Sequence, residues 1–309
     1  MRIVFMGTPD FAVPSLLALD QPGWQVVGVV TQPDRPRGRG QKVSFSPVKE
    51  AALSRGWPVF QPLKVKDENF LAELEELRPD AIVVVAYGQI LPEKILQLPP
   101  LGCINVHASL LPRYRGAAPI HWAIINGEQE TGITTMYMSR ELDAGDMILK
   151  AKVPITDTDT FGTLHDRLAT LGAELLVRTL IQIEQGQAPR EPQDHSRATY
   201  APMLNRETER INWGAGGQQI VNLIRGLNPW PGAYTLWEGN PLKIWQARFE
   251  PGTPLADPGT VVELRAEGPV VAAGDGHLVL TQLQPAGSRA MTGADFLRGR
   301  KLQAGTKLE

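Results

Sequence analysis

Two short segments of the chain supply an amide, an imidazole and a carboxylate, which are side chains used in acyl transfer. The first segment, residues 101–119 (LGCINVHASLLPRYRGAAP), holds Asn105 and His107 in an apolar run typical of a strand. Because the side chains of a strand alternate between its faces, Asn105 and His107 share one face. The second segment, residues 138–147 (MSRELDAGDM), places Asp143 in a turn just after an apolar run. If the two strands are neighbours, the Asp143 carboxylate can approach His107.

These side chains predict transfer of an acyl group to an amine without a covalent enzyme intermediate. Histidine titrates near neutral pH, so His107 can act as the general base that takes the proton of the attacking amine. The amide of Asn105 can donate to the developing oxyanion, and removing such a donor typically costs about 3 kcal/mol of barrier. Asp143 can hold the imidazole in one tautomer and stabilise its protonated form. We therefore interpret Asn105, His107 and Asp143 as candidate catalytic residues.

Each of these residues also has a simpler interpretation. Asn105 and His107 can cap turns at a strand end, and Asp143 can be only a turn former. Cys103 lies on the same face of the strand, so a Cys–His nucleophile is conceivable, although cysteine is most often a small buried hydrophobe. The histidines are scattered along the chain, at His107, His121, His165, His195 and His277. Because metal ligands lie at close spacing, we expect no catalytic metal.

The elements that must position these side chains alternate between strand and helix. Apolar runs rich in β-branched residues predict strands at 3–6, 26–30, 81–86, 103–107 and 133–138. Helix-like patterns occur at 13–19, 48–54, 69–77 and 160–185. This alternation predicts an α/β fold with a Rossmann-like, mostly parallel sheet and helices on both faces. In such sheets the ligand binds at the carboxyl ends of the strands.

The opening strand does not carry a nucleotide-binding motif. It leads into Gly7-Thr8-Pro9-Asp10-Phe11, with one of the three spaced glycines that a dinucleotide fingerprint needs. A phosphate-binding Gly-x-x-x-x-Gly-Lys-[Ser/Thr] loop is also missing from the sequence. A tight turn between strand and helix explains Gly7 and Pro9 better than a nucleotide site does.

The last third of the chain has a different pattern. Residues 188–205 are rich in proline and polar residues and predict a linker. A helix is expected at 216–226, followed by short strands at 233–237, 243–249, 260–264, 270–273 and 278–283. Five short strands separated by turns indicate a small OB-like β-barrel. We therefore predict a catalytic domain at 1–188, a linker at 189–205 and a β domain at 206–309.

The residues of the first segment resemble a known family. The stretch 105–112 (NVHASLLP), continued by 113–120 (RYRGAAPI), is similar to the signature of the 10-formyltetrahydrofolate-dependent formyltransferases. Further similar stretches are GTPDFA at 7–12, TQPDRP at 31–36, SPVK at 46–49, VVAYG at 84–88, NPWP at 228–231 and QPAG at 284–287. The resemblance therefore spans nearly the whole chain.

The resemblance implies a co-substrate and a site. It implies that 10-formyltetrahydrofolate is the formyl donor and that Asn105, His107 and Asp143 are catalytic. It also implies a folate site made of two groups of residues: Ser109, Leu110, Leu111 and Pro112, and Tyr87, Gly88, Ile90 and Leu91. One departure precedes Asp143, because the chain has Ser139-Arg140-Glu141 where relatives usually carry an acidic residue and a glycine.

The acceptor of the formyl group needs its own argument, since relatives act on different amines. A basic loop carries Arg35, Arg37, Arg39 and Lys42 among glycines. Such a loop can wrap around phosphates. Its charge alone is equally consistent with a flexible loop that contacts only solvent. The resemblance implies that the loop enters the acceptor arm of methionyl initiator tRNA, with Arg39 as the first choice for contact, and that the reaction serves translation initiation.

The β domain offers a weaker indication of RNA binding, since OB-like folds often bind nucleic acids. The domain carries basic residues that could contact phosphates but could equally be solvated surface: Lys243, Arg248, Arg298, Arg300 and Lys301. Core packing is the simpler interpretation of four tryptophans: Trp213, Trp230, Trp237 and Trp245.

The composition sets the remaining expectations. The chain has 309 residues, one cysteine and a formal net charge of −2, so RNA binding must use local patches. With no disulfide possible within the chain and no apolar run of membrane-spanning length, we expect a cytoplasmic enzyme. We also expect a monomer. Two alternatives remain open. One is formylation of a nucleotide sugar or a purine precursor, and the other is a non-catalytic folate- or RNA-binding module.

Overall fold

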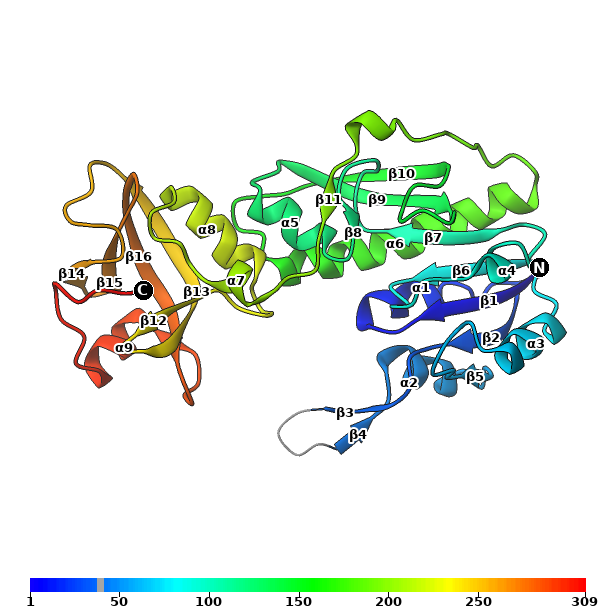
Figure 1. Ribbon diagram of the computed structural model, residues 1–309, viewed down its shortest axis with the longest axis horizontal. Coiled ribbons are helices and arrows are strands. Elements are labelled where there is room, and N and C mark those ends of the chain that lie inside the picture. The colour runs from blue at the N-terminus through cyan, green and yellow to red at the C-terminus, as the bar shows by residue number, and fades with distance from the viewer. Residues whose placement is uncertain (38–41) are drawn as a thin grey trace. The chain divides into compact units, whose positions relative to one another are not determined.

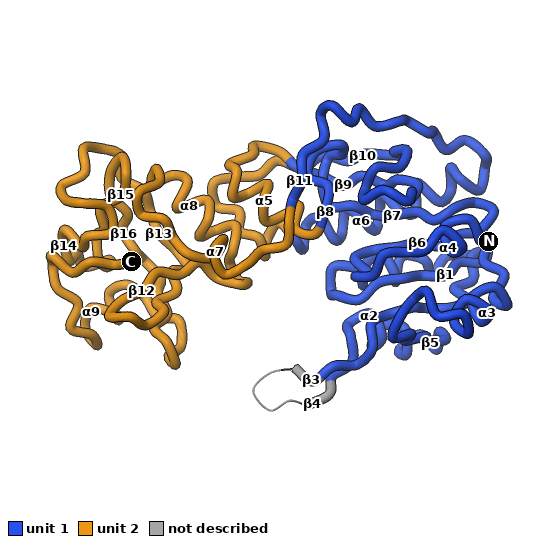
Figure 2. The backbone as a smooth tube through the Cα atoms, in the orientation of Figure 1, with its two compact units in different colours: residues 1–116, 131–153, 165–201 blue, residues 117–130, 154–164, 202–309 orange. Residues whose placement is uncertain are grey.

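The computed structural model describes residues 1–37 and 42–309, and only the backbone of residues 36, 37, 42 and 43. The chain divides into two compact units (Figure 2). Unit 1 comprises residues 1–116, 131–153 and 165–201, and unit 2 comprises residues 117–130, 154–164 and 202–309. Among the described helices, none is long and apolar enough to cross a membrane.

The central sheet of unit 1 has the strand order β10-β9-β7-β6-β1-β2-β5 (Figure 1). Its strands are β1 (Arg2–Gly7), β2 (Gln25–Val30), β5 (Val59–Phe60), β6 (Ala81–Val85), β7 (Cys103–His107), β9 (Glu130–Tyr137) and β10 (Met147–Pro154). The strands from β5 to β7 run parallel, and β9 runs antiparallel to β7. The carboxyl ends of β1, β6 and β7 therefore share one edge of the sheet.

Helices cover both faces of this sheet. Their bounds are α1 (Val13–Leu17), α2 (Pro47–Ser54), α3 (Glu68–Glu76), α4 (Glu93–Leu96) and α6 (Phe161–Glu184). Cys103 of β7 belongs to the same apolar cluster as Phe70 of α3 and Ile95 of α4. On the other face, Gly172 of α6 lies so close to Val106 that an added Cβ would be 3.1 Å from that side chain. The Asn105 and His107 face of β7 is thus the face that α3 and α4 cover.

Smaller elements of unit 1 lie in its loops. A hairpin pairs β3 (Arg35–Arg37) with β4 (Lys42–Ser44). Two-residue strands β8 (Arg115–Gly116) and β11 (Tyr200–Ala201) run parallel to each other. Short 3-10 turns lie at η1 (Asp10–Ala12) and η2 (His195–Arg197).

Unit 2 is built on an antiparallel sheet with the order β12-β13-β16-β15-β14, with β17 paired to β16. The strands are β12 (Tyr234–Trp237), β13 (Asn240–Pro251), β14 (Val261–Arg265), β15 (Gly268–Ala273), β16 (Gly276–Pro285) and β17 (Met291–Thr292). The helices are α5 (Pro119–Ile125), α7 (Arg206–Glu209), α8 (Gly217–Gly226) and α9 (Gly293–Gly299). Residues from α8 and α9, such as Ile220 and Phe296, fill the core beside the strands.

Residues 305–309 connect the two edge strands of this sheet. On one side, the N–H of Leu236 in β12 donates to the main-chain oxygen of Glu309 at 2.8 Å. On the other, the N–H of Val261 in β14 donates to the oxygen of Thr306 at 2.8 Å. Both edges are therefore paired, and the sheet closes into a small barrel.

The predicted fold class is confirmed in both of its parts, the mostly parallel sheet with helices on both faces and the later antiparallel sheet. Not predicted from the sequence were the short elements in the loops and, among the longer ones, strand β10 and helices α5 and α9. The prediction that Trp230 is a core residue is wrong, because its side chain is 64% exposed. Trp213 is buried, and its indole N–H donates to Thr235 Oγ1 at 3.0 Å.

Candidate active site

Strand β7 places Asn105 and His107 at the edge of the sheet where its parallel strands end. Asn105 lies between Val84 of β6 and Met136 of β9, and His107 is the last residue of the strand. Both side chains are buried. Their position follows from the alternation of a strand, which turns both toward the same face.

The Asp143 carboxylate lies against both of these side chains. Its Oδ1 accepts a hydrogen bond from Asn105 Nδ2 at 3.5 Å, and its Oδ2 lies 3.7 Å from His107 Nδ1. A shorter hydrogen bond, 2.8 Å from the N–H of Gly116, holds Oδ2 in place. The structure thus brings together the amide, the imidazole and the carboxylate of the three candidate catalytic residues.

The loop that carries Asp143 is tightly constrained. Asp143 has a φ of +49°, in the left-handed region that side-chain-bearing residues seldom adopt. Two residues later, a Cβ on Gly145 would lie 1.8 Å from the carbonyl oxygen of Tyr137, so this position admits only glycine. The N–H of Tyr137 donates to the main-chain oxygen of Asp146 at 2.9 Å and closes the turn. The departure at Ser139-Arg140-Glu141 leaves Asp143 directed at the site.

The imidazole of His107 has one tautomer that fits its surroundings. Its Nε2 lies 2.9 Å from the carbonyl oxygen of Tyr114. A carbonyl oxygen can only accept a hydrogen bond, so Nε2 carries a proton. In the neutral ring Nδ1 is then the basic nitrogen, and it is the atom that lies beside Asp143.

Cys103 shares the face of Asn105 and His107 but is poorly suited to act as a nucleophile. Its side chain is buried, and its Sγ donates to the carbonyl oxygen of Ile95 at 3.4 Å. Burial raises the pKa of the Cys103 thiol to about 12. Because the thiolate is the reactive form, a nucleophilic role loses its support.

Residues 109–112 are held by hydrogen bonds to Thr134 of β9 and to the chain itself. Thr134 Oγ1 donates to the carbonyl oxygen of Ser109 at 2.7 Å and accepts from the N–H of Leu111 at 3.1 Å. The Ser109 hydroxyl donates to the carbonyl oxygen of Arg113 at 2.6 Å. Leu111 is buried, and Leu110 and Pro112 are half-buried. The Ser109 and Leu111 side chains are therefore already engaged within the protein.

Residues 87–91 differ widely in how they are exposed. Tyr87 and Leu91 are buried in the apolar cluster under α3, and burial raises the pKa of Tyr87 to about 12. The carbonyl oxygen of Tyr87 accepts from Thr8 Oγ1 at 3.0 Å. Gly88 has a φ of +89°, and the Ile90 side chain is 87% exposed. Ile90 is thus the side chain of this group that is most accessible to a ligand.

The basic loop is described only in part. Arg35 is exposed in β3, while Arg39 lies outside the described residues. Arg37 and Lys42 pair through their backbones in the hairpin, and their side chains are not described.

The base of this hairpin has its own polar network. Lys49 Nζ contacts Asp34 Oδ2 at 2.5 Å and Gln61 Oε1 at 2.8 Å. The amide of Gln61 donates to Asp34 Oδ1 at 2.8 Å. The hydrogen bond from Lys49 is the main reason that the pKa of Asp34 lies below its usual value.

Most of the basic side chains proposed for the β domain have partners in the protein. Arg248 forms ion pairs with Glu250 and Glu267, and Arg298 pairs with Asp295. The remaining three differ, since Lys243 Nζ donates to the carbonyl oxygen of Pro231, Arg300 donates to Ser288 Oγ, and Lys301 is exposed. The ion pairs reduce the positive charge that Arg248 and Arg298 offer to a phosphate.

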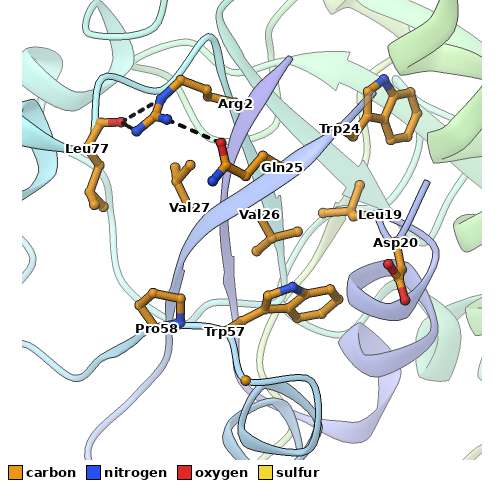
Figure 3. Close-up of a pocket in the computed structure, with 11 residues that line it drawn as sticks. Arg2, Leu19, Asp20, Trp24, Gln25, Val26, Val27, Trp57, Pro58 and Leu77 are labelled. Atoms are coloured by element: carbon orange, nitrogen blue, oxygen red, sulfur yellow. Dashed lines mark hydrogen bonds between the residues drawn. The ribbon is translucent and has the colours of Figure 1, made fainter. Parts of the chain in front are cut away.

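Two cavities of the described structure lie away from His107. One, of about 440 Å³, lies at the amino-terminal ends of β1 and β2, between Trp24, Trp57 and Arg2 (Figure 3). There the Arg2 guanidinium already donates to the carbonyl oxygen of Leu77 at 2.7 Å. The other, of about 490 Å³, lies beside residues 60–64. Among the described residues, no group of three or more histidine, cysteine, aspartate or glutamate residues is placed to hold a metal.

Comparison with known proteins identifies the family. A family model described as formyl transferase matches residues 1–180, more than half of the chain. The chain belongs to the formyl transferase family. A second model, described as formyl transferase, C-terminal domain, matches residues 203–301. The family resemblance seen in the sequence is thereby confirmed, and this formyl transferase is an enzyme that moves formyl groups.

Similar proteins in other organisms extend the match over the whole chain. The methionyl-tRNA formyltransferase of Pelotomaculum thermopropionicum is 57% identical over 310 aligned residues, which cover 100% of this formyl transferase and 98% of that protein. Two solved structures share the fold at lower identity. An N-formyltransferase from Helicobacter canadensis in complex with folinic acid and dTDP-3-aminofucose has a TM-score of 0.68 at 20% identity, with 92% of this chain and 98% of that chain covered.

The second solved structure is HypX from Aquifex aeolicus in complex with tetrahydrofolic acid. It has a TM-score of 0.64 at 20% identity and covers 99% of this formyl transferase. The chain spans about half of HypX, 50% of its length.

Proposed function

We propose that this formyl transferase moves the formyl group of 10-formyltetrahydrofolate to the α-amino group of methionyl initiator tRNA, in support of translation initiation. Relatives at 47–57% identity over nearly the full chain are methionyl-tRNA formyltransferases. The observation that carries the chemistry is the convergence of Asn105, His107 and Asp143, with contacts of 3.5 and 3.7 Å.

The attacking group in this reaction is an amine that must lose a proton. An α-amino group has a pKa of about 8, so a useful fraction of the amine is neutral at pH 7. As the amine nitrogen bonds to the formyl carbon, His107 takes the proton on Nδ1, the nitrogen that the Tyr114 contact leaves basic. The tetrahedral intermediate then collapses: the bond between the formyl carbon and N10 breaks, N10 takes the proton from His107 Nδ1, and tetrahydrofolate leaves with a neutral N10.

Asn105 supplies the oxyanion donor in this mechanism. Its Nδ2 contact with Asp143 is long, at 3.5 Å, so little is lost when the amide donates to substrate instead. Asp143 favours the protonated imidazole by its negative charge, and the Gly116 N–H keeps the carboxylate in position. No protein nucleophile and no metal takes part in this scheme.

We place the folate beside the carboxyl ends of β6 and β7, in contact with two groups of residues: Ser109, Leu110, Leu111 and Pro112, and Tyr87, Gly88, Ile90 and Leu91. In the first group, the Ser109 hydroxyl and the Leu111 side chain already have partners. In the second, Tyr87 and Leu91 are buried. The exposed Ile90 and the half-buried Leu110 and Pro112 are therefore the side chains with the most surface to offer to the pterin.

For the tRNA we retain the basic loop as the main contact, through Arg35, Arg37, Arg39 and Lys42. We assign residues 1–188 to catalysis, 189–205 to the connection and 206–309 to a second RNA contact. The barrel supports that assignment only through its fold, because ion pairs occupy Arg248 and Arg298. The proposed enzyme is cytoplasmic and monomeric.

The decisive assay offers the enzyme two acceptors side by side. We expect 10-formyltetrahydrofolate and methionyl initiator tRNA to give formylmethionine on the tRNA. A dTDP-amino sugar in the parallel reaction should remain unmodified. Formylation of the sugar alone would replace the proposed acceptor. Binding of folate and tRNA with no turnover of either acceptor would make the chain a binding module.

A further inference from the structure

A buried amide outside the candidate site contacts the loop that carries Asp143. Gln193 lies in the segment whose composition predicts a linker, yet its side chain is 5% exposed. Its Nε2 donates to the main-chain oxygens of Asp143 and Gly145, each at 2.8 Å. Its Oε1 accepts from Arg115, at 3.1 Å from Nε and 2.7 Å from Nη2.

These partners permit only one orientation of the Gln193 amide. A guanidinium has donors and no acceptor, so it must face the amide oxygen. The two carbonyl oxygens have no donor, so they must face the amide nitrogen. Exchanging the two ends of the amide would break all four contacts at once. The pattern of partners is therefore specific to glutamine.

Arg115 strengthens this arrangement by its charge. Its side chain is 3% exposed, and its other side-chain contact is Nη2 to His195 Nδ1 at 3.3 Å. A cation bound to the amide oxygen polarises the amide and makes its N–H groups better donors, an effect that is larger in a buried site. The Arg115 main chain also leads into Gly116, whose N–H holds the Asp143 carboxylate.

The backbone of the same segment is bound at two places: to the end of the loop that carries Asp143, and to the loop whose Gly116 N–H holds the carboxylate. Glu191 pairs with Met147 through two main-chain hydrogen bonds, of 2.9 and 3.0 Å. The N–H of Arg115 donates to the carbonyl oxygen of Thr199 at 2.9 Å. Gln193 therefore lies on a rigid support between the loop after β9 and the loop that ends in β8.

We propose that Gln193, oriented by Arg115, is the positioning residue that keeps the Asp143 carboxylate against His107 and Asn105. Asp143 holds an unfavourable positive φ, and such a conformation persists only where surrounding contacts fix it. The two Gln193 donors bind the carbonyl oxygens on either side of Ala144 and fix the loop at that point. The inference rests on the proposed role of Asp143.

The test uses Gln193→Glu, which keeps an acceptor for Arg115 but turns an oxygen toward the two carbonyl groups. We expect kcat to fall by about 10- to 100-fold, because small displacements of a catalytic group are costly. The KM for 10-formyltetrahydrofolate should stay within about 2-fold, since the donor site is not touched. Gln193→Met, which removes the donors and the acceptor together, should give a similar loss. Thr179→Val is the matched control, because Thr179 is a buried polar residue that bonds Thr135 and Leu175, away from the loop. It should keep full turnover.

A double-mutant cycle with Asp143→Ala separates positioning from general support of the fold. If Gln193 acts through Asp143, its substitution should change kcat by less than about 2-fold once that carboxylate is gone. Equal losses in both backgrounds would overturn the inference, as would full turnover of both Gln193 variants. Failure of both variants to fold would assign the amide to stability and overturn it as well. Wild-type turnover of Asp143→Ala alone would instead refute the proposed mechanism.

Discussion

At the scale of single residues, the candidate site depends on main-chain groups as much as on side chains. The Tyr114 carbonyl oxygen selects the tautomer of His107, and the Gly116 N–H holds the Asp143 carboxylate. As a result, His107 Nδ1 and the Asn105 amide both face the same carboxylate, that of Asp143. In the proposed mechanism, His107 and Asn105 meet the substrate and Asp143 acts through them.

Asn105→Ala tests the oxyanion donor. Loss of one such donor should lower kcat by about 100-fold or more, while affinity for 10-formyltetrahydrofolate stays near the wild-type value. Single-turnover kinetics with methionyl-tRNA would measure the first quantity, and equilibrium folate binding the second.

Cys103→Ala is the control for that experiment, because Cys103 lies on the same face of β7. It should retain turnover, given that burial raises the thiol pKa to about 12. Near-normal kcat in the Asn105 variant would remove the amide from the mechanism. Loss of turnover only in the Cys103 variant would revive a thiol nucleophile.

At the scale of elements, two short structures depend on a few polar contacts. The β3–β4 hairpin is anchored at its base by Asp34, Lys49 and Gln61. The barrel of unit 2 is closed by residues 305–309, in which Leu308 is buried. A substitution at either set of contacts should therefore affect one element and leave the candidate site unchanged.

Asp34→Asn should loosen the hairpin by removing the charged partner of Lys49. The pKa of Asp34 lies below its ordinary value of 3.8 in the folded protein, so its carboxylate stabilises the fold above that value and the contribution is lost only as pH falls through the lower folded pKa. Amide hydrogen exchange in β3 and β4 should therefore speed up by the same factor at pH 6 and at pH 8. Asp20→Asn, which removes the exposed pair with Arg55, should leave that exchange unchanged. The assignment would be contradicted if the variant exchanged faster than the wild type at only one of these two pH values.

Leu308→Ala should destabilise the barrel. Removing a buried leucine side chain typically lowers the free energy of unfolding by about 2–5 kcal/mol. Thermal or urea unfolding followed by tryptophan fluorescence would measure the loss, since Trp213 is buried in the same core. The matched control is Leu264→Ala in β14, a side chain that is 43% exposed and should cost less than about 1 kcal/mol. Equal losses would mean that residues 305–309 do not support the core.

At the scale of the whole molecule, the sequence predicted the architecture better than the loops. That Asn105 and His107 share one face of β7 could be predicted, because the alternation of side chains along a strand depends only on the local sequence. The approach of Asp143 requires β9 beside β7, which the alternating pattern suggests and the sheet order contains. The roles of Tyr114, Gly116 and Gln193 depend on loops brought together from distant parts of the chain, and no local pattern specifies them.

The same limit applies to elements at the margins of the fold. Strand β10 lies at the edge of the sheet, and its second half alternates between half-buried and exposed residues. The misplacement of Trp230 has a similar cause, since an aromatic residue in NPWP carries no sign of which way its turn faces. Burial is set there by the packing of α5, α8 and the barrel, a tertiary property.

Arg39→Ala tests the proposed contact between the basic loop and tRNA. Phosphate contacts supply much of the affinity for RNA, so the variant should use methionyl initiator tRNA less efficiently while binding 10-formyltetrahydrofolate normally. The salt dependence of tRNA binding should also become shallower, by about one unit or less in the slope of log Kd against log salt. Lys301→Ala in the barrel is a useful comparison. If only that substitution weakens tRNA binding, the barrel and not the loop holds the RNA.

The contact between His107 Nε2 and the Tyr114 carbonyl oxygen limits how protons move through the candidate site. An imidazole whose second nitrogen is committed to the backbone cannot relay a proton across its ring to bulk solvent. A proton that arrives on Nδ1 must depart from Nδ1. We therefore expect one nitrogen atom to serve first as base toward the incoming amine and then as acid toward N10 of the departing tetrahydrofolate.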